Sequence, residues 1–208
     1  MFLSRLKLNP VSRSTRELLL KPYLFHQAIY HAFPDSTDER ILYRIDQDRL
    51  GYLNLIVQSD IEPDWSKAEY LQNCLLEPAE YKLFTPTFSE GQMLTFRLRA
   101  NPTKRLGKSA VENKGKRIGI FHEDEQIKWL KRKGESGGFT VINCRTSSEG
   151  IVHNEVGKDE GKLRHYAVLF NGVLSVTDAE LFRQTVKNGV GSAKGFGFGL
   201  LSLAPVRK

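Results

Sequence analysis

Three side chains that can exchange protons recur at helical spacing in the segment 22–34, PYLFHQAIYHAFP. Tyr23, His26 and Tyr30 stand at i, i+3 and i+7, so a helix over this segment carries them on one face. A histidine titrates near neutrality and can take the proton of an RNA 2′-OH or protonate the 5′-oxygen leaving group. A tyrosine hydroxyl can orient the ribose or donate a hydrogen bond to a nonbridging oxygen. If the substrate is RNA, such a pair could support cleavage without a metal, by attack of the RNA's own 2′-OH on the adjacent phosphorus.

The helix that would position these groups is predicted over residues 22–33, with Pro22 in its first turn. Tyr23 and His26 lie on the rim of its apolar stripe. Ordinary packing at the edge of a core, with an apolar body and a solvated tip, accounts for the same placement, so the pattern alone leaves both interpretations open. The stripe follows i, i+3, i+4, i+7, i+8 and consists of Phe25, Ala28, Ile29, Ala32 and Phe33.

A glycine-rich segment, GVGSAKGFGFG, occupies residues 189–199. A nucleotide-binding loop follows a strand and opens a helix, whereas this segment follows a predicted helix and leads into a strand. Two alternatives remain: a helix C-cap with a tight connection, or a main-chain surface pressed against an anionic polymer. In the second case Lys194 is the residue expected to touch phosphate. We expect Phe196 and Phe198 to pack in the core rather than stack on bases.

Basic residues are concentrated between positions 97 and 117. The net charge of +7 and the isoelectric point of about 9.4 favour an anionic partner, and nucleic acid is the commonest. A solvated charged hairpin is one interpretation of this stretch, and an arm that contacts phosphates is the other. Against the single Glu112, it holds Arg97, Arg99, Lys104, Arg105, Lys108, Lys114, Lys116 and Arg117.

Metal, secretory and membrane functions find no support in the sequence. His122, His153 and His165 show no metal-ligand spacing, and we expect no metal and no cofactor. Cys74 and Cys144 are far apart, which is typical of free thiols in a cytoplasmic protein. No run approaches 18 apolar residues and the opening residues lack an apolar core, so neither a membrane span nor a signal peptide is expected.

The hydrophobic pattern predicts the order β-α-β-β-α-β twice, which is the ferredoxin-like unit. Strands are expected at 2–8, 42–45, 52–57 and 81–84, then at 93–99, 139–144, 164–176 and 198–204. Helices are expected at 22–33, 64–71, 122–133 and 178–187, a turn at 171–172, and functional loops at 101–117 and 145–162. The fold class is therefore α+β, with two tandem ferredoxin-like (RRM-like) domains at 1–88 and 92–208.

Four stretches resemble, from end to end, the CasE (Cse3) family of CRISPR repeat-RNA endoribonucleases: MFLSRLKLNP, PYLFHQAIYHAFP, FRLRANPTKR and GVGSAKGFGFGLLSLAP. The last is the most specific, because the family ends in a glycine-rich loop followed by residues similar to GFGLLSLAP. The resemblance implies two ferredoxin-like domains and metal-independent cleavage at the 3′ base of the hairpin in a CRISPR repeat transcript. It also implies 5′-hydroxyl and 2′,3′-cyclic phosphate ends, and retention on the crRNA within the Cascade complex. No membrane partner and no direct contact with DNA are expected.

The resemblance also implies roles for particular residues. His26 corresponds to the catalytic histidine and Tyr23 to its partner tyrosine. The aromatic residues with which true RRM domains stack single-stranded bases are not evident, which fits a protein that recognises a stem. The residues expected to bind RNA are Arg97, Arg99, Lys104, Arg105, Lys108, Lys162, Arg164, Gly191, Ser192, Lys194 and Gly195.

Two other functions are compatible with parts of the sequence. The first is a non-catalytic module that holds an RNA hairpin as a scaffold subunit, and a cleavage assay with labelled repeat RNA separates it from an enzyme. The second is a small nucleotide-binding protein, which equilibrium dialysis against ATP or GTP would test. The position of the glycine-rich segment, between a helix and a strand, argues against the second function.

Overall fold

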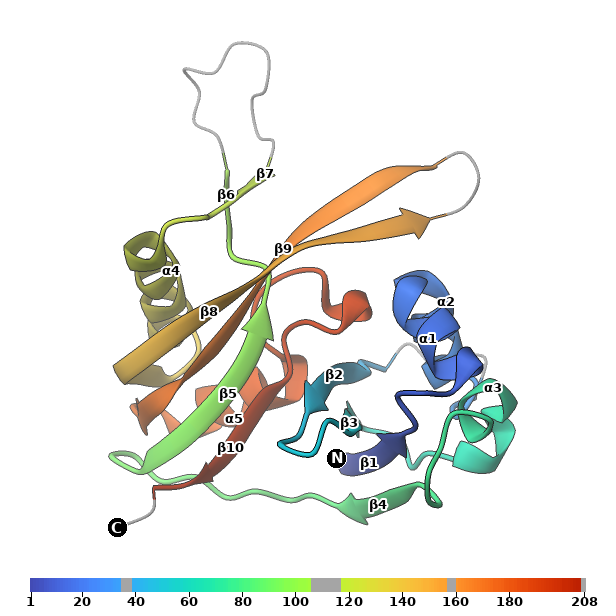
Figure 1. The fold of residues 1–208 in the computed structure, drawn as a ribbon. Helices are drawn as coiled ribbons and strands as arrows, with labels where there is room; N and C mark the ends of the chain where they lie inside the picture. The colour runs from blue at the N-terminus through green and yellow to red at the C-terminus, as the bar shows by residue number, and fades with distance from the viewer. Residues whose placement is uncertain (35–38, 106–116, 157–159, 207–208) are drawn as a thin grey trace. The chain divides into compact units, whose positions relative to one another are not determined.

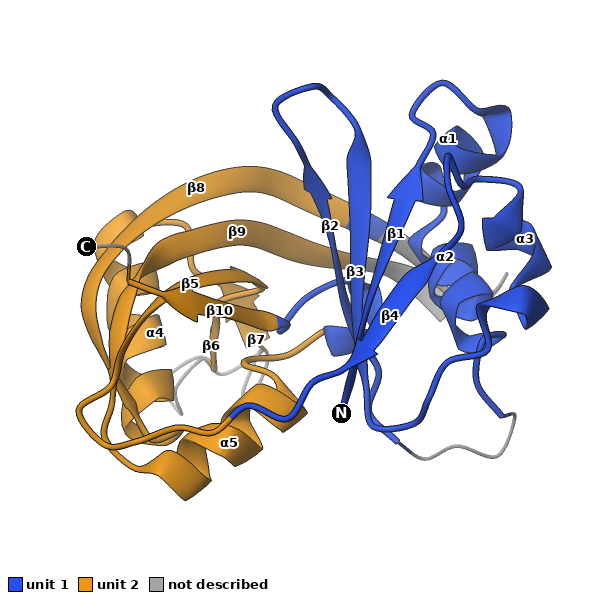
Figure 2. Ribbon diagram, turned by 90° about the horizontal axis from the view of Figure 1, so that it is seen from below, with its two compact units in different colours: residues 1–86, 153–163, 194–200 blue, residues 87–152, 164–193, 201–208 orange. Residues whose placement is uncertain are grey.

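A computed structural model describes residues 1–34, 39–105, 117–156 and 160–206, without the side chains of 154–163 (Figure 1). The chain forms two compact units, coloured separately in Figure 2. Unit 1 comprises residues 1–86, 153–163 and 194–200, and unit 2 comprises 87–152, 164–193 and 201–208. The predicted domain boundaries at 88 and 92 stay a prediction, and residues 194–200 group with the N-terminal unit.

The sheet of unit 1 is antiparallel and has the strand order β2-β3-β1-β4. Its strands are β1 (Phe2–Leu8), β2 (Leu42–Gln47), β3 (Leu53–Ser59) and β4 (Glu80–Leu83). Alternation in β1 turns Leu6 and Leu8 into the core, where both are fully buried. Leu6 is paired with Leu55 of β3, so the register brings two core leucines together.

The helices of unit 1 cover one face of this sheet (Figures 1 and 2). They are α1 (Arg13–Leu20), α2 (Pro22–Tyr30) and α3 (Glu69–Gln72), with a 3-10 turn η1 (Trp65–Lys67) before α3. Phe25 and Ile29 of α2 belong to the same core cluster as Leu6 and Leu55. Burial of this apolar stripe fixes the rotation of α2, and therefore the direction of its other faces.

Unit 2 repeats the arrangement with the strand order β10-β5-β9-β8. Its strands are β5 (Met93–Ala100), β8 (Phe139–Val156), β9 (Glu160–Val176) and β10 (Leu201–Pro205), with helices α4 (Glu123–Glu135) and α5 (Ala179–Asn188) and a ribbon of β6 (Thr103–Arg105) and β7 (Arg117–Gly119). The Asp178 carboxylate caps α5 by accepting a 2.9 Å hydrogen bond from the Leu181 N–H. In each unit the first strand lies between the third and the fourth, which is the ferredoxin-like order. The predicted α+β fold class is confirmed.

Several predicted elements differ from the structure. The predicted turn at 171–172 is wrong, because β9 continues through it and Gly172 pairs with Phe96. A Cβ at Gly172 would lie 2.1 Å from the carbonyl oxygen of Asn143, so this glycine serves close strand packing rather than a turn. The predicted loop at 145–162 is largely the extension of β8 and β9. Its strand character was hidden because residues 145–152 are mostly exposed and lack apolar alternation.

Helix boundaries also shift. Helix α2 ends at Tyr30 rather than 33, where the N–H groups of Ala32 and Phe33 bond three residues back. The predicted helix at 64–71 divides into η1 and α3, and the last strand begins at Leu201 rather than 198. Helix α1 was missed, because it buries only Thr15 and Leu18. Among the described helices, none is both long and apolar enough to cross a membrane.

Candidate active site

His26 lies on α2 at the edge of the unit 1 core. Its imidazole is 4.2 Å, between ring centroids, from the phenol ring of Tyr30, which is the contact expected from i, i+4 spacing. The Nδ1 atom is buried and has no hydrogen-bond partner among the residues that the structure describes. Burial lowers the pKa of His26, because desolvation penalises the charged imidazolium. The side chain is therefore a neutral imidazole at pH 7 and is competent to accept a proton.

Gly195 brings main chain against this imidazole. It is the middle residue of the 3-10 turn η2 (Lys194–Phe196). A Cβ built on Gly195 would lie 3.4 Å from Cε1 and 3.6 Å from Nδ1 of His26. These are ordinary van der Waals distances, so a methyl group would just touch the ring and the main chain of Gly195 lies close beside the imidazole. Residues 194–199 of the glycine-rich segment and His26, which is 169 positions before Gly195, thus form one site within unit 1.

Two side chains of β2 hold residues 194–200 in place. The Tyr43 hydroxyl donates a 3.1 Å hydrogen bond to the Gly195 carbonyl, and its ring packs 5.7 Å from that of Phe25 on α2. Arg44 is 3% exposed and donates from Nη1 to the carbonyl of Leu200 at 3.2 Å. The Arg44 guanidinium also forms a 2.7 Å ion pair with Asp46. Because both β2 residues are buried, the loop backbone is fixed where it faces His26.

Tyr23 lies one turn before His26 on α2, as predicted, and its side chain is 37% exposed. Its phenol is therefore accessible to a ligand beside the imidazole. Lys194 opens η2 and is partly buried. His26, Tyr23, Lys194 and Gly195 are thus the predicted site residues of unit 1 whose side chains and backbone the structure describes.

The first half of the glycine-rich segment belongs to unit 2. Gly189 ends α5 with φ 73°, which confirms the predicted helix end. Gly191 has φ 91°, and a Cβ there would lie 3.2 Å from the Trp129 ring, so this glycine is needed for two reasons. Phe198 is fully buried, which confirms the prediction that it packs in the core, whereas Phe196 is only partly buried and the same prediction is not confirmed for it.

Three of the predicted RNA-binding cations already have polar partners in unit 2. Arg97 donates from Nε to Asn171 at 2.9 Å. Arg99 forms a 2.5 Å ion pair with Glu149, and Lys104 a 2.8 Å ion pair with Glu125. If these cations contacted RNA, each would exchange a partner within the protein for a phosphate. The net contribution of each contact to the binding free energy is therefore smaller.

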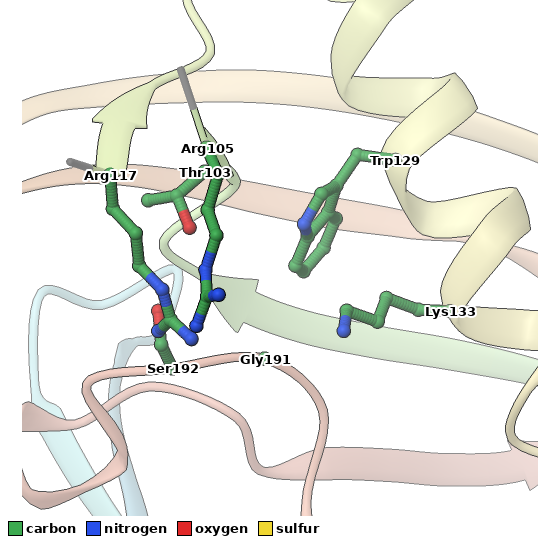
Figure 3. Close-up of a pocket in the computed structure, with 7 residues that line it drawn as sticks. All are labelled: Thr103, Arg105, Arg117, Trp129, Lys133, Gly191 and Ser192. Carbon is green, nitrogen blue, oxygen red and sulfur yellow. The ribbon is translucent and has the colours of Figure 1, made fainter. Parts of the chain in front are cut away.

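Arg105 belongs to a different environment, a hollow of about 210 Å³ in unit 2 (Figure 3). It stands opposite Arg117 in the β6–β7 ribbon, and the two guanidinium groups reach toward Ser192. The hollow is lined by Thr103, Arg105, Arg117, Trp129, Lys133, Gly191 and Ser192. Three predicted residues, Arg105, Gly191 and Ser192, therefore come together there. The prediction missed Trp129 and Lys133, which looked like ordinary residues of an amphipathic helix.

The other predicted cations lie elsewhere. Lys108 is outside the described residues, and so is the side chain of Lys162, although its backbone belongs to β9. Arg164 lies further along β9 with an exposed side chain. Among the described residues, no cluster of three or more His, Cys, Asp or Glu side chains could hold a metal ion.

Comparison with known proteins decides the family. A family model described as "CRISPR associated protein" matches residues 1–205. The chain belongs to this family. The CRISPR-associated endoribonuclease Cse3 of Thermus thermophilus is 36% identical over 99% of this chain and 100% of its own length. The Cascade subunit CasE of Escherichia coli is 30% identical over 88% of this chain and 92% of its own.

Among solved structures, this family member is similar to Thermus thermophilus Cse3 bound to an RNA representing a pre-cleavage complex. The TM-score is 0.80 at 35% identity, and the match covers 98% of each chain. The family resemblance inferred from the four sequence stretches is confirmed. Tyr43 and Arg44 could not have been assigned to the site from the sequence, because no local pattern links β2 to residues 194–200.

The lowered pKa of His26 can be tested directly on this CRISPR-associated protein. Because burial disfavours the imidazolium, the Cε1–Hε1 resonance of His26 should titrate with a midpoint below 6.5 in the RNA-free protein. The measurement is a pH series of ¹H–¹³C NMR spectra, with His26→Gln to assign the peak. A midpoint at or above 6.5 would contradict the desolvated environment described here.

Proposed function

We propose that this chain is a metal-independent endoribonuclease that binds the hairpin of CRISPR repeat RNA and cleaves it at its 3′ base. The observation that carries the proposal is the neutral His26 imidazole, closed on one side by the main chain of Gly195. The two similar relatives support it, one named an endoribonuclease and the other a Cascade subunit. After cleavage the protein stays on the crRNA as a Cascade subunit in the cytoplasm, without a direct contact to DNA.

The reaction needs one base and one positioned strand. Neutral His26 accepts the proton of the 2′-OH next to the scissile phosphate. The 2′-oxygen then bonds to phosphorus while the bond to the 5′-oxygen breaks. The 5′-oxygen takes up a proton from solvent and His26 releases to solvent the proton that it accepted, which leaves a 2′,3′-cyclic phosphate and a 5′-hydroxyl. The phenol of Tyr23 donates a hydrogen bond to a nonbridging oxygen, where negative charge accumulates in the transition state. Burial near His26 strengthens these interactions, because water screens them less.

Rigid backbone around His26 supports catalysis rather than mere binding. Tyr43 and Arg44 fix residues 194–200, so the wall beside the imidazole is already in place before RNA arrives. Lys194, at the start of η2, adds positive charge next to this wall. In unit 2 the cations of β5 and of the β6–β7 ribbon supply sequence-independent attraction for the RNA backbone.

A scaffold protein would bind the RNA without cleaving it. The 2′-oxygen next to the scissile phosphate distinguishes an enzyme from a scaffold, because only cleavage requires it. In repeat RNA with a 2′-deoxy nucleotide immediately 5′ of the scissile phosphate, cleavage should be lost while affinity stays within about twofold. Cleavage of the unmodified RNA should proceed at full rate in excess EDTA. Product from the deoxy RNA, or a requirement for Mg²⁺, would contradict attack by the 2′-OH with His26 as base.

A further inference from the structure

Three cationic side chains converge on the hollow of unit 2. Arg105 and Arg117 face each other across the β6–β7 ribbon, and Lys133 reaches in from α4 (Figure 3). The hydroxyl groups of Thr103 and Ser192 belong to the same lining. Among the described residues, no carboxylate lines the hollow and none forms an ion pair with these three cations. Lys104, whose amine has Glu125 as partner, shows how a neighbouring residue of the same ribbon is neutralised.

Such a cluster is unfavourable unless an anion joins it. Like charges directly opposite in a ribbon repel, and Arg105 and Arg117 are directly opposite. Two guanidinium groups with an ammonium and two hydroxyls offer the charged donors that phosphate oxygens accept. We propose that this hollow binds a single phosphate group. The source is a backbone phosphate of bound RNA or a free phosphate monoester.

Size and shape limit the ligand to the phosphate itself. The volume of about 210 Å³ is below the roughly 300–1,000 Å³ of pockets that enclose drug-sized ligands. Trp129, at the back, is only 4% exposed and stacks on Phe170 with a centroid distance of 6.0 Å. Gly191 lies against the edge of its indole. The tryptophan face is therefore covered, and a base cannot stack on it.

The first arm of the test uses inorganic phosphate as the probe. Phosphate is titrated into ¹⁵N-labelled protein at constant ionic strength, and the Nε–Hε resonances of Arg105 and Arg117 are followed. These resonances should shift and saturate, and Lys133→Gln should weaken the apparent affinity by about tenfold, the size of one charged hydrogen bond. Lys131→Gln, an exposed lysine two positions earlier on α4, is the matched control and should leave the affinity unchanged.

The second arm rests on the proposed function and uses repeat RNAs that each carry one neutral methylphosphonate. At one position the substitution should lower wild-type affinity by about tenfold, but should have no effect in the Arg117→Gln/Lys133→Gln double variant. If the effect of one methylphosphonate disappears in the double variant, the hollow binds an RNA phosphate. If only the titration with inorganic phosphate saturates, the hollow binds a free phosphate monoester. No response in either arm overturns the proposal. Cleavage by the double variant is measured in a separate assay. Failure of the phosphate-site proposal therefore does not count against the proposed endoribonuclease activity.

Discussion

Replacing His26 with alanine should lower the rate of repeat-RNA cleavage by about 10²- to 10⁴-fold, the usual contribution of a positioned acid or base. The variant loses the group that takes the 2′-OH proton, but no cation that attracts RNA. Hairpin affinity should therefore change by less than about threefold. Single-turnover cleavage and filter binding on the same preparation measure the two quantities.

The matched control is His31→Ala. His31 follows α2 directly and its side chain is exposed, so this change removes an imidazole of the same helix region without touching the site. Its cleavage rate should equal that of the wild type. Equal rates for His26→Ala and wild type would remove His26 from the mechanism, and equal losses for both histidine variants would point to damage of α2 rather than to chemistry.

Replacing Arg44 with alanine should lower the free energy of unfolding by about 3 kcal/mol or more, because it leaves Asp46 without its buried partner. It also removes the hydrogen bond to the Leu200 carbonyl, so residues 194–200 lose an attachment to β2. Cleavage should fall by more than the loss of folded protein explains. Urea denaturation followed by circular dichroism measures the first effect, and cleavage per folded molecule the second.

Arg49→Ala provides the comparison for this change. Arg49 is an exposed arginine in the connection that follows β2, and its removal changes the net charge by the same amount. Its unfolding free energy should stay within about 0.5 kcal/mol of the wild type. Similar denaturation curves and similar cleavage for the two arginine variants would show that Arg44 does not hold the loop.

The parts of the fold that local chemistry determines were predictable. The alternation of β1, the stripe of α2, the Asp178 cap and the Gly189 helix end all follow from residues close together in the chain. The arms of β8 and β9 were not predictable in this way. Residues 145–152 of β8 are mostly exposed, so this arm is held by backbone pairing rather than by an apolar pattern.

In the candidate site, too, some features follow from residues close together in the sequence and others do not. Spacing on one helix singled out His26, and glycine density singled out residues 189–199. The contact between them depends on Tyr43 and Arg44, whose buried hydrogen bonds to carbonyl groups leave no trace in the local sequence. A count of positive residues likewise treats Lys104 and Arg105 alike, although among the described residues only Lys104 has a carboxylate partner.

One measurement tests most directly whether this chain cuts RNA or only holds it. Labelled repeat RNA is incubated with purified wild-type protein in EDTA and resolved on a denaturing gel, beside a native gel of the same mixture. An endoribonuclease of the kind proposed here should make a single cut at the 3′ base of the hairpin and leave a 2′,3′-cyclic phosphate on the upstream fragment. RNA that is bound on the native gel but intact on the denaturing gel would contradict it and would make the protein a scaffold.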